Sequence, residues 1–162
     1  MSDGLFFSIS YKKSMAQLRD YQIEIRDKAI SLLKEFKIAY LSMEVRTGKT
    51  LTALSTASEY GAKNVLFLTK KKAIASIESD HKALGCSFNL TVTNYEQVGN
   101  LLACYDLVIL DEAHSLGQFP TPAKKIKQIK AICKGLPIIY LSGTPTPESY
   151  SRVFHQLYVS SY

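Results

Sequence analysis

Tryptophan is absent from the sequence, and cysteine, histidine and proline are scarce. The three cysteines, Cys86, Cys104 and Cys133, form no Cys-x-x-Cys pair and have no histidine at metal-ligand spacing, which argues against a disulfide framework and a zinc site. No apolar run reaches the ~18 residues of a membrane helix, and residues 1–13 lack the pattern of a signal peptide. We therefore expect a protein of the reducing cytoplasm that is neither secreted nor membrane-spanning.

The composition is that of a chain able to bury a core. Hydrophobic residues make up 46% of the 162 residues and charged residues 21%, which fits one folded domain and excludes a disordered tail. Lysine and arginine number 20 against 14 aspartate and glutamate, so the net charge is +6. This excess favours a polyanionic partner, although an ordinary basic surface explains it equally well.

Short apolar runs alternate with helical patterns along the chain. The runs cover residues 38–43, 65–69, 90–93, 107–110 and 138–141, and the helical patterns cover 18–36, 50–60, 71–84, 95–103, 122–133 and a stretch from 147. Strands that are apolar along their whole length are typical of a parallel sheet covered on both faces. The pattern predicts an α/β fold with a doubly wound, mostly parallel sheet and its ligand site at the carboxyl ends of the strands.

Gly48-Lys49-Thr50 follows the first predicted strand and opens a helix. In a phosphate-binding loop of this kind, glycine lets the backbone approach closely, lysine neutralises phosphate charge, and the threonine hydroxyl binds Mg²⁺. The full motif also requires glycine at position 43, where this chain has Met43. Alone, the triplet is a weak indication of nucleotide binding.

A pair of acids follows the most apolar predicted strand. Residues 107–110 lead directly into Asp111-Glu112-Ala113-His114. Asp111 is expected to hold Mg²⁺, directly or through water, and Glu112 to orient and polarise the attacking water. A solvated surface turn is a poor alternative, since it explains neither the buried strand before the acids nor the Gly-Lys-Thr triplet.

With both motifs in place, the sequence resembles the superfamily 2 helicases and translocases, in particular the Swi/Snf branch. The resemblance implies a RecA-like P-loop NTPase domain that uses ATP and Mg²⁺ and contacts nucleic acid, in this branch DNA. Residues 18–22, Leu-Arg-Asp-Tyr-Gln, are similar to the motif with which the family recognises adenine, which implies adenine contacts for Arg19 and Gln22. Without the family, Gln22 is simply a solvated residue near a helix start.

Residues 44–50 are similar to the phosphate-binding loop of that branch, which implies a role for Thr47 beside Gly48 and Lys49. Met43 stands where the branch has aspartate, and Arg46 where it has glycine. Arg46 places a bulky cation where the family has a flexible backbone, and one interpretation is that it contacts a phosphate.

Two further motifs resemble loops that contact the nucleic-acid backbone in the family. After the second strand, Thr69 and Lys70 are the matching residues, with Lys71 next to them; after the third strand, they are Thr93, Asn94 and Tyr95. A solvated lysine run explains the first loop about as well. An ordinary helix N-cap is the better explanation of Asn94 if the resemblance is set aside.

Ser142-Gly143-Thr144-Pro145 resembles the motif that links the nucleotide site to nucleic-acid binding. The resemblance implies a coupling role for Ser142, Gly143 and Thr144, together with His114. Taken alone, the tetrapeptide is an ordinary turn after a strand.

The resemblance runs from residue 18 to about 154 and leaves no place for the family's second RecA-like domain, which carries the arginine fingers. We expect residues 1–162 to be the N-terminal ATP-binding domain of a longer protein, weak or inactive as an ATPase on its own. Two alternatives remain open: another P-loop enzyme such as a small kinase, and a scaffold module that binds a nucleotide or has lost that ability. The lysine-rich helix at 124–134 fits a solvated exterior better than a DNA contact.

Overall fold

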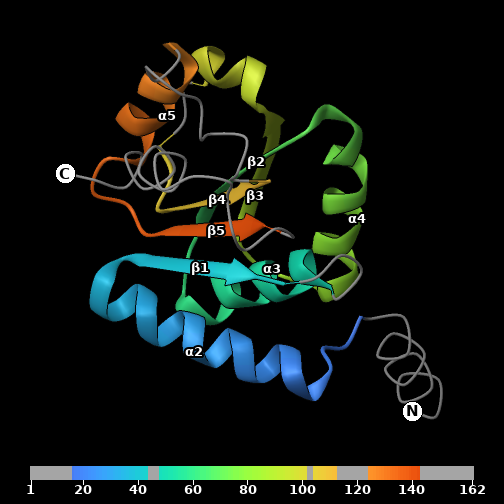
Figure 1. Cartoon of the computed structure of the whole chain (residues 1–162). Coiled ribbons are helices and arrows are strands. Elements are labelled where there is room, and N and C mark those ends of the chain that lie inside the picture. Colours follow the sequence, from blue (N-terminus) through green and yellow to red (C-terminus); the bar gives the residue numbers. More distant parts are fainter. Residues whose placement is uncertain (1–15, 44–47, 102–103, 113–123, 143–162) are drawn as a thin grey trace.

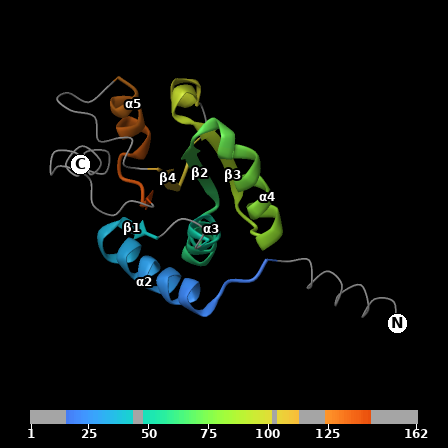
Figure 2. The same cartoon turned by 45° about the vertical axis from the view of Figure 1, so that its right-hand side comes forward.

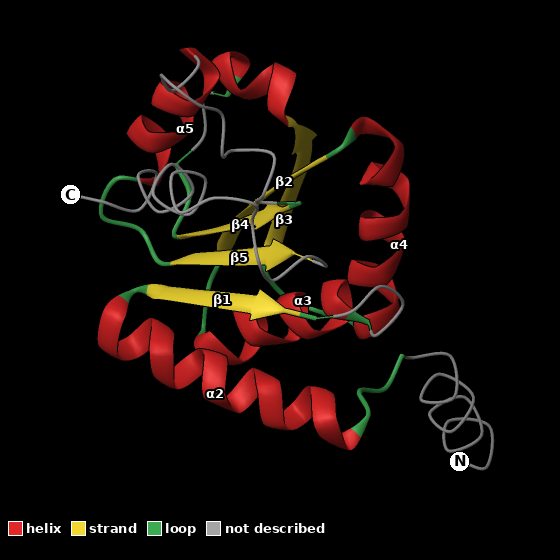
Figure 3. Ribbon diagram, in the orientation of Figure 1, coloured by secondary structure: helices red, strands yellow, loops and turns green. Residues whose placement is uncertain are grey.

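The structure is a computed structural model, and it describes residues 16–43, 48–101, 104–112 and 124–142. Five parallel strands form one sheet in the order β1-β5-β4-β2-β3 (Figures 1 and 3). The strands are β1 (Ile38–Ser42), β2 (Asn64–Thr69), β3 (Asn89–Asn94), β4 (Leu107–Asp111) and β5 (Ile138–Ser142). The predicted α/β fold with a parallel sheet is confirmed.

Burial along the strands follows their position in the sheet. Every residue of the central strands β4 and β5 is buried, as is β2 after its first residue. This explains why these segments are apolar throughout rather than alternating, because helices cover both faces of the sheet. β3, at the edge of the described sheet, is only partly buried.

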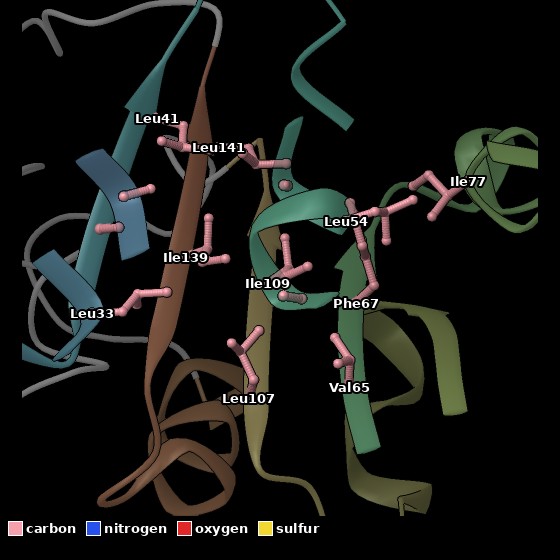
Figure 4. Packing of buried hydrophobic residues seen from close by; sticks show 14 of the residues in the cluster. Leu33, Leu41, Leu54, Val65, Phe67, Ile77, Leu107, Ile109, Ile139 and Leu141 are labelled. Atoms are coloured by element: carbon pink, nitrogen blue, oxygen red, sulfur yellow. The ribbon is translucent and has the colours of Figure 1, made fainter. Parts of the chain in front are cut away.

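One face of the sheet is covered by α2 (Asp20–Phe36), α3 (Lys49–Tyr60) and α4 (Ile74–Leu84). Figure 4 shows how Leu33, Leu54 and Ile77 of these helices pack over strand residues such as Phe67 and Ile109. The six central residues of α3, Thr52 to Ala57, are all buried. This packing fixes the start of α3, which carries the predicted phosphate-binding residues.

The other face is covered by the 3₁₀ helix η2 (Tyr95–Asn100) and by α5 (Lys124–Cys133) (Figure 2). Ile129 and Cys133 of α5 are buried there against β4 and β5. The lysines described at positions 124, 127 and 134 are exposed. The helix therefore has the amphipathic character that its sequence predicts.

Two predicted elements differ from the structure. The segment 95–103, predicted as a helix, forms only the six-residue η2, and Leu101 after it is extended. The predicted helix 71–84 begins as a short 3₁₀ turn, η1 (Lys71–Ala73), before α4. In the first case the reason is tertiary: Tyr95 and Val98 are anchored in the core three residues apart, a spacing that suits a 3₁₀ turn. The helix predicted from 147 lies outside the described residues.

All three cysteines are free thiols, Cys104 exposed and Cys133 buried.

Of the helices within the described ranges, none has both the length and the hydropathy needed to cross a bilayer.

Candidate nucleotide-binding site

The predicted site residues lie where the parallel strands end. Because all five strands run in the same direction, their carboxyl ends meet at one edge of the sheet. Ser42, Thr69, Asn94, Asp111 and Ser142 are the last residues of β1, β2, β3, β4 and β5. β5 lies between β1 and β4. Buried Ser142, at the end of β5, therefore lies between the end of β1, which precedes the predicted phosphate-binding residues, and Asp111 at the end of β4.

Gly48 is the N-cap of α3 and has a left-handed backbone with φ of 76°. Its carbonyl accepts hydrogen bonds from the backbone N–H and the hydroxyl of Thr52, both at 3.0 Å. A Cβ at position 48 would lie 2.1 Å from Nε2 of Gln22. Glycine is thus required here for two reasons: the backbone conformation is left-handed, and the Gln22 amide lies where a Cβ would be.

Gln22 joins the start of α2 to the start of α3. It is only 4% exposed; its Oε1 accepts a hydrogen bond from the backbone N–H of Arg19 at 2.7 Å, and its Nε2 donates to the carbonyl of Gly48 at 3.4 Å. Gln22 is therefore not the solvated residue of the alternative explanation. The structure places it against Gly48 of the predicted phosphate-binding motif, and its adenine contact stays a prediction.

Lys49 lies between the two acids of the second motif. Its Nζ is 3.4 Å from Oε1 of Glu112 and 3.9 Å from Oδ1 of Asp111. The side chains are 18% exposed for Lys49, 9% for Asp111 and 28% for Glu112, so water screens this group less than a surface ion pair. The structure brings together the residues whose proximity the sequence analysis predicted.

Asp111 is held at three atoms. The hydroxyl of Thr69 donates to Oδ2 at 2.8 Å, the backbone N–H of Glu112 donates to Oδ1 at 3.0 Å, and the hydroxyl of Tyr95 donates to the main-chain carbonyl. Glu112 itself has a left-handed φ of 56°, one of two non-glycine residues with positive φ in the described part of the chain. Such a conformation is unfavourable for glutamate and is maintained by the surrounding contacts.

Tyr95 is 8% exposed, and its pKa is raised well above the ordinary value of 10.0. Burial is the main cause, followed by the negative charges of Asp111 and Glu112. The phenol therefore remains protonated over the physiological range, and its hydroxyl remains a hydrogen-bond donor to Asp111.

The residues predicted to contact nucleic acid fall into two groups. Lys70 is exposed and Thr93 is half-buried, whereas the side chains of Thr69 and Tyr95 are buried and engaged with Asp111. A direct side-chain contact of Thr69 or Tyr95 with a phosphate backbone does not fit this placement. Asn94 is half-buried, and its side-chain oxygen accepts hydrogen bonds from the backbone N–H groups of η2 at positions 96 and 97, as an N-cap does.

Holding Asp111 is the function that sequence reasoning missed for Thr69 and Tyr95. A hydroxyl side chain at the end of a predicted strand, or just after it, is the available signal, since a buried hydroxyl must find a partner. That signal does not say which partner is chosen.

The donor set at this edge fits a hard divalent cation. Thr50, in the first turn of α3, offers a hydroxyl and Asp111 a carboxylate, the oxygen ligands that Mg²⁺ prefers. Within the described ranges, no three His, Cys, Asp or Glu side chains gather at one point. An ion here would therefore take its remaining ligands from water and a phosphate substrate.

Met43, which departs from the family motif, is buried in the core with 6% exposure, and its backbone N–H donates to the carbonyl of Ser142 at 3.2 Å. Its side chain thus contributes to packing. Arg46, Thr47, His114, Gly143 and Thr144 lie outside the described residues.

Residues 15–83 match the family model described as the type III restriction enzyme res subunit. Among curated protein sequences, none matches the chain.

Among the solved structures that share the fold, three illustrate the similarity. The Sulfolobus solfataricus SWI2/SNF2 ATPase core in complex with dsDNA has 17% identity and a TM-score of 0.71 over 89% of this chain and 36% of that one. The Pyrococcus furiosus Hef helicase domain has 19% identity and a TM-score of 0.63 over 87% and 35%. The DNA-bound type ISP restriction-modification enzyme LlaBIII has 21% identity and a TM-score of 0.57 over 82% and 13%.

The chain thus spans about a third of the length of the first two structures and 13% of the third. The predicted resemblance is confirmed at the level of the fold: the chain shares the architecture of a domain in the SWI2/SNF2 ATPase core and in the Hef helicase structure.

Proposed function

We propose that the chain is the first motor domain of an ATP-dependent DNA helicase or double-stranded DNA translocase. The observation that carries this proposal is the position of Lys49, within 4 Å of both Asp111 and Glu112 at the carboxyl edge of a RecA-like sheet. A lysine at a helix N-terminus facing two carboxylates is an arrangement suited to a metal-bound triphosphate.

In the structure the ammonium group of Lys49 lies beside the two acids and offsets part of their charge. When ATP binds, we expect Lys49 to exchange these contacts for phosphate oxygens, because several formal negative charges there outweigh one or two carboxylates. Bound Mg²⁺ would supply further neutralisation of the phosphate charge, with Thr50 and Asp111 as its protein ligands. Glu112, no longer bonded to Lys49, would then accept a hydrogen bond from the water that attacks the γ-phosphorus.

The start of α2 is the proposed adenine site, with Arg19 and Gln22 as its residues. Both polar atoms of the Gln22 side chain are already bonded, to Arg19 and Gly48. In this proposal Gln22 exchanges one of these hydrogen bonds for one to adenine. The exchange costs little, since one bond replaces another.

Nucleic acid is the proposed partner of the loops after β2 and β3. Lys70, Lys71 and Lys72 are exposed together at the start of η1. A duplex contacted through its phosphates is held by such cations without regard to sequence. Lys70, Thr93 and Asn94 keep their predicted backbone contacts in this proposal, and Ser142 keeps its coupling role between the strand ends.

We further propose that a second RecA-like domain of the same protein completes the catalytic site. The chain spans only about a third of the helicase structures that it resembles. An arginine supplied from outside typically contributes ~10³–10⁵ in the rate of phosphoryl transfer. On its own the chain is therefore expected to bind Mg-ATP and to hydrolyse it slowly.

The test is ATP turnover by the protein that contains this domain, measured with and without a DNA duplex. Stimulation by DNA is the expected result. Turnover that depends on a small acceptor and ignores DNA would support the kinase alternative. A chain that does not bind Mg-ATP at millimolar concentration would support the scaffold alternative.

A further inference from the structure

We propose that Thr69 and Tyr95 are positioning residues that fix Asp111 and connect the two surface loops after β2 and β3 to the metal-binding edge. The inference rests on the proposed function, in which Asp111 holds Mg²⁺ and the loops meet nucleic acid. It assigns the two buried hydroxyls a different task from the surface contact expected from the sequence.

The two hydroxyls hold different parts of the same residue. Thr69 donates to the carboxylate oxygen Oδ2 of Asp111 at 2.8 Å, and Tyr95 donates to its main-chain carbonyl. The first bond orients the group that would bind metal. The second fixes the peptide that leads into Glu112, whose φ of 56° must be held by its surroundings.

The two residues reach Asp111 from different elements. Thr69 ends β2, which pairs directly with β4, whereas Tyr95 follows β3, which pairs only with β2 in the described sheet. The Tyr95 side chain must therefore cross the end of β2 to meet Asp111, and its ring packs in the core cluster with Leu68 and Leu110. Two segments separated in sequence thus meet on one acid.

Each buried residue has an exposed neighbour in the chain. Thr69 at 0% exposure is followed by exposed Lys70, and Tyr95 is followed by exposed Glu96. A ligand that moves Lys70 or Glu96 therefore moves the peptide attached to a residue that holds Asp111. If a ligand on the loops changes the affinity of Asp111 for metal-nucleotide by some factor, linkage requires that metal-nucleotide change the affinity of the loops for that ligand by the same factor.

The first experiment measures the positioning of Asp111 directly in the 162-residue chain. Amide hydrogen exchange of Glu112 reports on its hydrogen bond to Asp111 Oδ1, because this N–H donates to it at 3.0 Å. In Tyr95→Phe and Thr69→Val, which keep the side-chain volume, exchange at Glu112 should rise at least tenfold. Thr69→Ser, which keeps the hydroxyl, should restore the wild-type exchange rate.

Two matched controls remove a hydroxyl elsewhere. Thr56→Val deletes a fully buried hydroxyl that donates to the Thr52 carbonyl within α3, and Tyr60→Phe deletes a half-buried phenol hydroxyl at the end of that helix. Neither should alter exchange at Glu112. Unchanged exchange in both Tyr95→Phe and Thr69→Val, or equal increases in the controls, would overturn the positioning role.

The second experiment adds a 20-base-pair DNA duplex to the ¹⁵N-labelled chain. In the wild type, the amide signals of Lys70, Glu96 and Glu112 should all shift. In the Thr69→Val/Tyr95→Phe double variant, the shifts at Lys70 and Glu96 should remain, and the shift at Glu112 should fall to less than half.

The outcomes separate the inference from the proposed function. Shifts at Lys70 without any at Glu112 in the wild type would overturn the connection and leave DNA binding intact. No shift anywhere would contradict DNA binding and the connection together, and the exchange rate of Glu112 in the variants would still decide whether Thr69 and Tyr95 position Asp111.

Discussion

The ammonium nitrogen of Lys49 lies 3.4 Å from Oε1 of Glu112, a residue 63 positions away in the chain. This contact joins the two motifs on which the nucleotide hypothesis depends. It also holds the positive charge of Lys49 beside two carboxylates, at a helix start where we expect phosphate to replace them.

Lys49→Ala tests that exchange. Loss of the charge-assisted hydrogen bonds to phosphate should cost about 2–3 kcal/mol, or roughly 30- to 150-fold in Mg-ATP affinity. Calorimetric titration of the purified chain measures it. Lys63→Ala, an exposed lysine just before β2, is the matched control and should bind like the wild type. Equal Mg-ATP affinity in the two variants would show that Lys49 does not contact the nucleotide.

Gly48→Ala separates backbone strain from steric conflict. Gly48 and Gly61 both have positive φ, 76° and 94°, but only at Gly48 would a Cβ meet another residue, the amide of Gln22. Gly61→Ala should cost about 1–2 kcal/mol in the free energy of unfolding. Gly48→Ala should cost about 1–2 kcal/mol more, because Gln22 must leave its two partners.

Gln22→Ala provides the control for that interpretation. In the Gln22→Ala background, Gly48→Ala should cost no more than Gly61→Ala, since the amide that it displaces is gone. Urea unfolding of the four variants gives the coupling energy. Additive effects would show that Gln22 is not pressed against the phosphate-binding loop.

Glu112→Gln should leave Mg-ATP binding intact and lower turnover by about 10²–10⁴-fold, since the amide cannot accept the proton of the attacking water. The measurement belongs in the protein that also contains the proposed second motor domain. Glu59→Gln, an exposed glutamate of α3, should not change the rate. Normal turnover in Glu112→Gln would show that another residue orients the attacking water.

Lys70→Ala should weaken duplex binding uniformly across DNA sequences. If Lys70 contacts one phosphate, the slope of log K against log salt concentration should fall by about 0.9. Fluorescence anisotropy over a salt series measures the slope. Lys34 is exposed on α2, and Lys34→Ala removes the same charge. This control variant should keep the salt slope of the wild type. Identical slopes would place the DNA elsewhere.

The thiols should differ sharply in reactivity. Burial raises the pKa of Cys133 to about 12, whereas Cys104 is exposed. At pH 8 the thiolate fraction of Cys133 is lower than that of an ordinary thiol by roughly a thousandfold, so iodoacetamide should modify Cys104 first. Mass spectrometry of the digested protein detects this order, and denaturant should abolish it. Equal rates in the folded protein would contradict the burial of Cys133.

The same pKa shift makes stability depend on pH. The unfolded thiol of Cys133 ionises near its ordinary value of 9.0, while the folded thiol stays protonated up to about 12. Its contribution to the free energy of unfolding is therefore complete below pH 9 and decreases as the pH rises from 9 to 12.

Much of the fold could be predicted because its causes are local. Apolar runs such as 107–110 and 138–141 become buried parallel strands, and Gly48 and Gly61 bound α3 as their backbone freedom suggests. The proximity of Lys49 and Asp111 could be predicted because the carboxyl ends of parallel strands meet at one edge of the sheet.

What the sequence did not predict depends on tertiary contacts. The buried hydroxyls of Thr69 and Tyr95 both donate hydrogen bonds to Asp111 from other parts of the sheet. The spacing of these residues along the chain does not predict this pairing. Likewise, the side chain of Met43 packs in the core, and its backbone N–H continues the pairing of β1 with β5 by donating to the carbonyl of Ser142. Gln22 is buried because Gly48 leaves room for it.

The most direct test of the central claim, that the Gly48–Thr50 bend and the Asp111–Glu112 pair serve one metal-bound triphosphate, is paramagnetic broadening by Mn-ATP. In the ¹⁵N-labelled chain, Mn-ATP should broaden the amide signals of Lys49 and Glu112 together at substoichiometric concentration, with Mg-ATP as the diamagnetic control and Lys63 at the opposite edge much less affected. Broadening confined to one of the two segments, or spread equally to Lys63, would contradict a shared nucleotide site.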